Sequence, residues 1–375
     1  MASKPKFIHC VGNPSFNPSA YITDTERQSK AIDLLAKDDL YHATILSFSL
    51  PERDDYTYHA MTAVRLGQVQ HIVSLGGANN LHAWYRAEDG SVLDPPPKAD
   101  IEAYINIFLP STLNSSALKG FAANAKKSSI RASVASHLTT KRFLHPSLPP
   151  SFTIPRCKKS PPSSNPYFDF WAWSARNLEW CGPSPASRAL TSHHVLPILM
   201  HHFGCATPSH EALELLRLVA AGRPVVDIGS GNGYWTFMLR RYGLEVRPVD
   251  NMQSEWRVNW VDDTEVAEGT KWLARHDGGK DHVMLLVYPV VGGGVAGGVE
   301  GGFTRDLVKA FKGDTIAVVG TQNRNGYTGF RDMTMDEFME KEEKEWTKIV
   351  QVPLPSFAGK DEALYIFRRG DAAPS

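Results

Sequence analysis

The feature that most restricts the fold of this chain is a glycine-rich turn between an apolar strand and an amphipathic helix, within residues 223–242. A run of apolar residues leads to Asp227, and glycines follow at positions 229, 231 and 233. Apolar side chains then recur at helical spacing. Glycines allow a sharp bend and a close backbone approach to a ligand, and the first amides of the helix are available to bind one. The pattern predicts a strand, a turn and a helix that together form one side of a ligand site.

A second acidic residue supports this interpretation. Asp250 lies 23 residues after Asp227, at the end of the next predicted strand, residues 244–250. A carboxylate at that place can accept hydrogen bonds from both hydroxyls of a ribose. The spacing of the three glycines after Asp227 differs from the Gly-x-Gly-x-x-Gly pattern that serves a pyrophosphate. The sequence therefore indicates a nucleoside-containing cofactor.

Over residues 208–370 the chain resembles the class I S-adenosylmethionine-dependent methyltransferases. Asp227, the three glycines and Asp250 carry the resemblance. It implies an α/β fold with a Rossmann-like, seven-stranded sheet and S-adenosylmethionine as the cofactor. Another nucleotide-binding α/β domain is the alternative, which the ordered strands disfavour. The further strands expected in the family's order are residues 258–261, 281–288, 314–320, 348–354 and 363–368.

The resemblance also implies which residues bind the cofactor. The strand-end acid and the glycine turn would hold its amino-acid part, the second acid its ribose, and an acid after the third strand would lie near the adenine amino group. The candidate cofactor-binding residues are Asp227, Gly229, Ser230, Gly231, Asn232, Gly233, Asp250, Asn251, Asp262, Asp263 and Tyr288.

Catalysis is expected beside the ends of the fourth and fifth strands, where the family binds its acceptor. Methyl transfer from a sulfonium is a direct displacement, so the protein must align the acceptor and assist the loss of any proton it carries. Tyr288, Asn323 and Tyr327 are the candidate catalytic residues, although each also suits a turn or a packing role. Residues 292–302 contain seven glycines and are expected to form a flexible insertion beside this site.

The acceptor stays open. The fourth strand ends in Val-Tyr-Pro, which differs from the Asp or Asn-Pro-Pro-aromatic signature of adenine amino-methylating enzymes, and the Lys-Asp-Lys-Glu set of ribose methyltransferases is not evident. The function indicated is methyl transfer. A small molecule and RNA are favoured about equally as the acceptor, and a protein acceptor is less favoured. A catalytically inactive, methyltransferase-like binding or scaffold protein is the alternative.

The charge distribution along the chain is relevant to RNA binding. Lys and Arg together equal Asp and Glu at 40 each, so the net charge is zero. Residues 103–168 nevertheless contain nine basic side chains, all within residues 119–159, and no carboxylate. This stretch is either a solvated linker or a basic arm that contacts phosphate, and RNA is therefore a possible partner through residues 119–159.

A length of 375 residues suggests two cores. Residues 1–110 are expected to be a small α/β region of unknown role, with strands at 6–11, 43–48 and 70–75 and a helix at 24–37. Residues 111–166 are expected to be a Ser/Pro-rich connector, part of it mobile. Residues 167–372 would form the methyltransferase-like domain with an N-terminal helical extension, residues 185–202 and 208–221.

The remaining patterns point to an intracellular protein, cytoplasmic or nuclear. Four cysteines without Cys-x-x-Cys spacing argue against a zinc ribbon and a disulfide scaffold. Four histidines between positions 193 and 202 fall in pairs too far apart on one helix to share a metal, so we expect none. The longest apolar stretch, residues 283–291, is far below the roughly 20 residues that span a bilayer, so no membrane association is expected.

Overall fold

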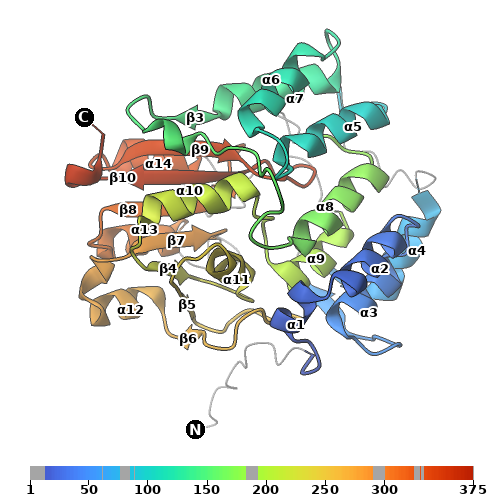
Figure 1. Ribbon diagram of the computed structural model, residues 1–375, viewed down its shortest axis with the longest axis horizontal. Helices are drawn as coiled ribbons and strands as arrows, with labels where there is room; N and C mark the ends of the chain where they lie inside the picture. The colour runs from blue at the N-terminus through green and yellow to red at the C-terminus, as the bar shows by residue number, and fades with distance from the viewer. Residues whose placement is uncertain are drawn as a thin grey trace.

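The fold is built around one large mixed β-sheet with helices on both faces (Figure 1). The computed structural model describes residues 13–374, except residues 61, 77–84, 88, 183–192, 290–299, 325–329 and 331–332. The expected strand at residues 6–11 therefore lies outside the described residues.

The large sheet has eight strands in the order β3-β9-β10-β8-β7-β4-β5-β6. Five of them, β4 to β8, run parallel to one another, whereas β10 is antiparallel to both β8 and β9. The eighth strand is an addition to the expected seven, because β3 pairs with the edge strand β9. The bounds are β3 (Phe143–Leu144), β4 (Val225–Ile228), β5 (Val246–Asp250), β6 (Glu265–Val266), β7 (Val283–Val287), β8 (Thr315–Thr321), β9 (Thr347–Pro353) and β10 (Glu362–Arg368).

Alternating side chains give the sheet two apolar faces, as the strand period of two requires. In β8, Ala317 and Val319 face one core, and Ile316 and Val318 face the other. Helices α8 to α11 cover the first face, and α12 to α14 cover the second. These helices are α8 (Pro166–Asn177), α9 (Val195–Phe203), α10 (His210–Ala220), α11 (Tyr234–Arg241), α12 (Gly269–Arg275), α13 (Gly302–Ala310) and α14 (Met335–Glu342).

The two cores are thus the two sides of one sheet rather than the centres of two separate units. The first core is continuous from Phe16 to Ile366 and includes side chains from all three expected regions. The amino-terminal elements pack onto α8 and α9 (Figure 1). They are α1 (Pro18–Thr23), α2 (Thr25–Leu35), α3 (Leu40–Phe48), β1 (Thr57–His59), β2 (Ala63–Arg65), α4 (Leu66–Leu75) and α5 (Lys98–Ile105), followed by the 3-10 turn Asn106–Phe108.

The expectation of a small α/β region at the amino terminus is wrong in part. The helix expected at residues 24–37 is present as α2, capped by the Asp24 side chain. Residues 43–48 and 70–75, expected as strands, belong to helices α3 and α4. In α4 the buried residues Leu66, Val69 and Val73 follow helical spacing, which a six-residue window at 70–75 does not reveal. The described strands of this region are the short antiparallel pair β1 and β2.

Residues 111–166, expected to be a Ser/Pro-rich connector of which part is mobile, contain more regular structure than that expectation implies. They fold into α6 (Asn114–Ala123), α7 (Ile130–Lys141), β3 and the 3-10 turn Pro150–Phe152. Leu118, Phe121, Val134 and Leu138 are buried, so these helices join the first core. Ser129 caps α7 through its side chain. A Ser-rich composition here supplies a helix cap rather than a linker.

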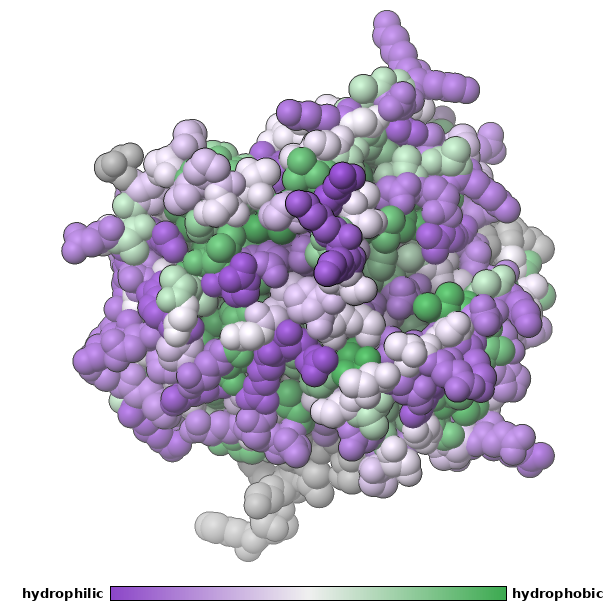
Figure 2. All heavy atoms as spheres, in the orientation of Figure 1, coloured by the Kyte–Doolittle hydropathy of each residue, from purple (hydrophilic) through white to green (hydrophobic). Residues whose placement is uncertain are grey.

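The described parts of the two expected helices are α9 and α10, and α10 starts at His210, two residues later than expected. Ser209 caps α10, and its side chain accepts from the Ala212 amide. The start expected at residues 184–185 lies outside the described residues. None of the helices in the described part of the chain is long and apolar enough to cross a bilayer. On the face drawn in Figure 2, hydrophilic side chains predominate and apolar ones are scattered among them.

Candidate functional site

The glycine turn between β4 and α11 has the conformation that its sequence requires. Gly229, Gly231 and Gly233 have φ values of 79°, 57° and 79°. This left-handed region is open to glycine and costly for other residues. The Gly229 amide donates to the Val249 carbonyl oxygen at 2.7 Å, which ties the turn to β5. The turn is therefore fixed at the carboxyl ends of two adjacent parallel strands.

Two glycines of the turn also lie too close to other groups to carry a side chain. A Cβ on Gly231 would lie 2.8 Å from Cζ2 of Trp256, and one on Gly233 would overlap Cγ2 of Val261. Trp256 and Val261 belong to the segment between β5 and β6, residues 251–264. This segment consequently packs directly on the turn.

Asp227 lies under the turn and is fully buried. Its Oδ2 accepts from the Thr236 hydroxyl at 2.7 Å, and its Oδ1 has no hydrogen-bond partner within the described residues. Burial raises the pKa of this carboxyl from 3.8 to about 7; the Thr236 bond lowers it, and the charge of Asp250 raises it. Asp227 is thus close to half protonated at neutral pH, and a cation near Oδ1 would favour its ionised form.

Asp250, at the end of β5, accepts from two backbone amides. Its Oδ2 accepts from Gly231 at 3.0 Å and its Oδ1 from Met252 at 2.7 Å. A carboxylate has about four acceptor positions, so each oxygen can accept one more hydrogen bond. That capacity suits the two hydroxyls of a ribose.

Buried polar atoms without a partner gather around the turn. They are Asp227 Oδ1, Ser230 Oγ, Asn232 Nδ2 and Trp256 Nε1, none of which has a hydrogen-bond partner among the described residues. Buried polar groups are nearly always satisfied in native proteins, so these atoms indicate a polar ligand that completes them. The set contains acceptor, donor and hydroxyl groups, which matches the ammonium and carboxylate of an amino acid. The residues present therefore fit the amino-acid part of S-adenosylmethionine.

The segment expected to contact adenine has a different secondary structure from the one expected. The third strand is β6 at Glu265–Val266, so the expectation of a strand at residues 258–261 is wrong. Trp260 instead donates its amide to the Asn232 carbonyl at 2.7 Å and its indole N–H to the His202 carbonyl at 2.6 Å. Trp260 thus bonds to the glycine turn and to α9 rather than to a neighbouring strand.

Three polar residues near that segment have other neighbours. Asp263 forms an ion pair with Arg240 at 2.7 Å, which lowers the pKa of its carboxyl. Asp262 is exposed. Asn251 follows Asp250 directly, and its Nδ2 donates to Glu268 Oε1 at 3.3 Å. Of these three, Asn251 lies next to Asp250, whereas the Asp263 carboxylate is already held by Arg240.

At the ends of β7 and β8 the structure describes two of the three candidate catalytic residues. Tyr288 has a φ of 54°, is 8% exposed, and has the Lys360 ammonium 5.4 Å from its ring centroid. Asn323 donates through Nδ2 to the Gly359 carbonyl at 3.3 Å. Tyr327 lies outside the described residues, as does most of the glycine-rich insertion. Both described side chains meet the segment between β9 and β10, residues 354–361.

A polar cluster at this edge was not apparent from the sequence. Asp361 is fully buried, accepts from Gln322 Nε2 at 2.9 Å, and lies 2.7 Å from Nε2 of His137 on α7. Gln322 in turn accepts from Gln351 at 2.9 Å. His137 and Asp361 are 224 residues apart, so no local pattern links them. The segment expected to be a connector thus reaches the edge of the sheet where the acceptor is expected.

The strand order decides the fold assignment. Numbered by their order in the chain from β4, the seven strands run 3-2-1-4-5-7-6, and the seventh is inserted antiparallel between the fifth and sixth. The glycine turn follows the first strand and Asp250 ends the second. The C-terminal region has the class I methyltransferase fold. The extra edge strand β3 comes from the preceding segment and leaves this order unchanged.

No family model and no curated protein matches the chain. Several solved structures resemble it at low identity. Magnesium protoporphyrin IX methyltransferase (ChlM) from Synechocystis PCC 6803 with bound SAM is 10% identical, covering 48% of this chain and 87% of that one, with a TM-score of 0.31. Ribosomal protein L11 methylase from Lactobacillus delbrueckii subsp. bulgaricus is 13% identical, covering 44% and 81%, with a TM-score of 0.26. MtNAS in complex with MTA and tNA is 14% identical, covering 81% and 97%, with a TM-score of 0.26.

Proposed function

We propose that this protein is an S-adenosylmethionine-dependent methyltransferase. The observation that carries the proposal is the group of unpartnered buried polar atoms around the glycine turn, Asp227 Oδ1 above all. Asp227 and the turn would bind the amino-acid part of the cofactor, and Asp250 its ribose hydroxyls. Asn251 lies next to Asp250, on the side where the adenine would continue. Tyr288, at the end of the fourth methyltransferase strand, would lie beside the sulfonium.

Bound S-adenosylmethionine supplies an electrophilic methyl group. The chain itself has to hold the acceptor in line with that group and exclude water. Asn323 presents an amide at the end of β8, where it can orient the acceptor, and Tyr327 is the second candidate for that role. Lys360, a residue that is 5% exposed, has its ammonium over the Tyr288 ring and adds positive charge at the same edge. A positive charge there favours an acceptor that carries or develops negative charge as its proton leaves.

The acceptor is a small molecule or RNA, with protein less favoured. Two of the nine basic residues of the stretch 119–159 are engaged in structure: Arg131 pairs with Asp100 at 2.9 Å and Arg142 with Glu211 at 2.5 Å. Most of the other seven basic residues face solvent. The exposed ones are Lys119, Lys126, Lys127, Arg156, Lys158 and Lys159. Exposed lysines and arginines without buried partners suit contact with phosphates, which supports RNA as one acceptor class.

The test incubates the protein with S-adenosylmethionine labelled on its methyl group and with separated small-molecule, RNA and protein pools. We expect label in one pool with the wild type and loss of that label with Gly231→Val, which would force Trp256 off the turn. Cofactor binding without label in any pool would contradict the proposal and favour a scaffold role. Label in RNA should decline with salt and on neutralising Lys126, Lys127, Lys158 and Lys159 together; label insensitive to both would contradict a role for these lysines.

An intracellular location, cytoplasmic or nuclear, is part of the same proposal. Cys157, Cys181 and Cys205 are free thiols in the described part of the chain. Free thiols suit a reducing compartment. Fractionation of cells with an antibody against the chain would check this, and recovery in the medium would contradict it.

A further inference from the structure

The segment 251–264 forms a wall of the cofactor site, and its contacts extend in two directions. It begins directly after the ribose acid Asp250. Trp256 packs on Gly231, and the Trp260 amide donates to Asn232 of the glycine turn. A displacement of this segment would therefore move groups on both sides of the amino-acid and ribose positions.

The same segment is fastened to the amino-terminal region through Arg257. Its guanidinium forms an ion pair with Asp54 at 2.9 Å, and the two side chains are 12% and 3% exposed. The guanidinium also stacks on the Tyr56 ring, 4.9 Å from its centroid. The Arg257 backbone donates to the His201 carbonyl at 2.9 Å and accepts from the Asn13 amide at 3.2 Å. One residue of the cofactor wall is thus held by three separate elements of the chain.

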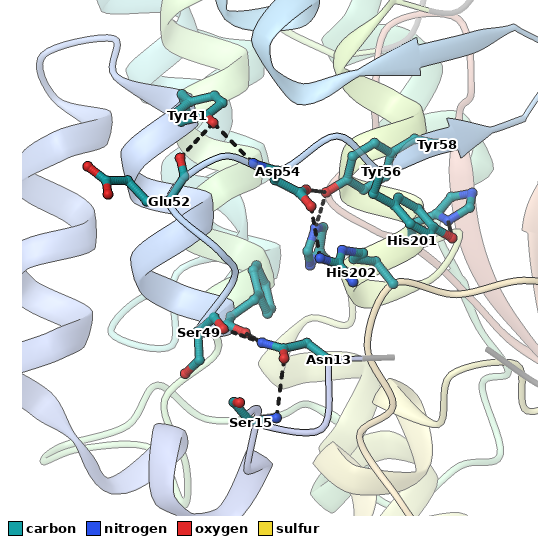
Figure 3. Close-up of polar contacts among 12 residues, drawn as sticks. Asn13, Ser15, Tyr41, Ser49, Glu52, Asp54, Tyr56, Tyr58, His201 and His202 are labelled. Carbon is teal, nitrogen blue, oxygen red and sulfur yellow. Dashed lines mark hydrogen bonds and ion pairs between the residues drawn. The ribbon is translucent and has the colours of Figure 1, made fainter. Parts of the chain in front are cut away.

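Asp54 is itself held by tyrosine hydroxyls, and imidazoles lie next to the tyrosines of this region (Figure 3). The Tyr58 hydroxyl donates to Asp54 Oδ2 at 3.2 Å and lies 3.1 Å from Nε2 of His202. The neighbouring pair repeats the arrangement: the Tyr56 hydroxyl lies 3.1 Å from Nδ1 of His201. Burial lowers the pKa of His202 far below its usual range, with the charges of Arg257 and His201 adding to the effect. His202 is therefore neutral, and Asp54 is left as the anionic partner of Arg257.

We propose that the amino-terminal region positions the cofactor-binding segment through the Asp54–Arg257 pair, and that Arg257 is a positioning residue for S-adenosylmethionine. This inference rests on the proposed function. Without Asp54, the Arg257 guanidinium would be buried without a counter-charge, and hydrating it requires the segment to move. Trp256, which directly precedes Arg257, would move away from Gly231 together with the segment. The ligand would then have to reorder the segment, and its affinity would fall.

Thermodynamic linkage makes the effect reciprocal. If the β1–β2 pair steadies the cofactor segment, a bound cofactor must steady β1 and β2 equally. We therefore expect S-adenosylhomocysteine to slow hydrogen exchange at the paired amides of β1 and β2. The side chain of Tyr58 and the carbonyl of His59 bond to Asp54, His201 and His202, none of which is a candidate cofactor-binding residue, so a purely local ligand effect would leave exchange in β1 and β2 unchanged.

The experiment titrates the full-length protein with S-adenosylhomocysteine and follows both heat and hydrogen exchange. Arg257→Met and Asp54→Asn are expected to weaken binding by about 5- to 150-fold, the usual range for coupled sites. Arg257→Lys retains the charge and should recover part of the affinity. The matched control is Arg176→Met, which breaks an exposed ion pair with Glu102. This variant should bind S-adenosylhomocysteine as the wild type does.

The outcomes separate this inference from the proposed function. No binding by the folded wild type contradicts the proposed function itself. Wild-type binding that Arg257→Met leaves unchanged contradicts only the positioning role. Wild-type binding without slower exchange at residues 57–65 also contradicts it, and that measurement decides the matter if the variants fail to fold.

Discussion

Binding of S-adenosylhomocysteine should release a proton from Asp227. The carboxyl is fully buried, its Oδ1 has no hydrogen-bond partner in the part of the chain that the structure describes, and burial raises its pKa to about 7. S-adenosylhomocysteine carries the ammonium group that the amino-acid part of the cofactor would bring to this oxygen. An ammonium next to the carboxyl favours the ionised form, so the ligand selects protein in which Asp227 has lost its proton.

The size of the effect follows from the pKa. At pH 7 about half of the molecules carry the proton, so binding should release about 0.5 proton, rising to about 0.9 at pH 6 and falling to about 0.1 at pH 8. Because only the ionised fraction is competent, the apparent dissociation constant should be about tenfold larger at pH 6 than at pH 8.

Isothermal titration calorimetry in buffers of different ionisation enthalpy measures this release directly. The observed enthalpy at pH 7 should depend on the buffer enthalpy with a slope that corresponds to about half a proton. Asp227→Asn should abolish the slope. Asp169→Asn is the matched control: burial also raises the pKa of Asp169 to about 7, but this residue lies on α8 and outside the turn, so the slope should persist. Wild-type binding at pH 7 with no dependence on buffer would refute the placement of the ammonium at Asp227.

Three further predictions concern stability. Gly233→Ala should lower the unfolding free energy by about 1–3 kcal/mol more than Gly243→Ala, because only at position 233 would the new Cβ overlap a neighbour; equal losses in thermal melts would contradict this. Arg142→Met should cost about 3–5 kcal/mol, because Glu211 is 3% exposed, whereas the exposed Arg176→Met should cost no more than about 1 kcal/mol in urea unfolding. In the ligand-free protein, three carboxyls with raised pKa values bind more protons folded than unfolded, so they lower stability as the pH rises from about 4 to 8, and replacing all three with their amides should remove this contribution; the same pH dependence of the unfolding free energy in the variant and the wild type would contradict it. The carboxyls concerned are Asp169 and Asp227, with pKa values of about 7, and Glu362, with a pKa of about 8.

The C-terminal sheet is largely predictable from the sequence because its strands are buried on both faces. Runs such as residues 316–319 are apolar at every position and buried on both faces, so they stand out without tertiary information. The glycine turn is predictable for a related reason, since three left-handed residues allow few alternatives to glycine. The prediction of the third strand at residues 258–261 was wrong because Val258 and Trp260 are buried in a loop, where Trp260 bonds to the glycine turn and to α9. Burial alone does not distinguish a strand from a packed loop.

The amino-terminal half was harder to predict because its contacts join distant parts of the chain. Residues 43–48 contain Thr and Ile, which favour strands, yet Asp39 caps a helix there and the core buries it. In the candidate site, Asp227 and Asp250 are recognisable from their spacing to the glycines. The roles of Trp256, Arg257 and His137 depend on partners that only the fold brings near them, and no local signal marks them.

The most direct test of the account is a calorimetric titration of the wild type and of Asp250→Ala with S-adenosylhomocysteine at pH 8. The site geometry predicts saturable one-to-one binding by the wild type. It predicts at least about tenfold weaker binding by Asp250→Ala, because the variant loses the acceptor for the ribose hydroxyls and for the Gly231 amide. A folded wild-type protein that binds no S-adenosylhomocysteine would contradict the cofactor site, and with it the proposed methyl transfer.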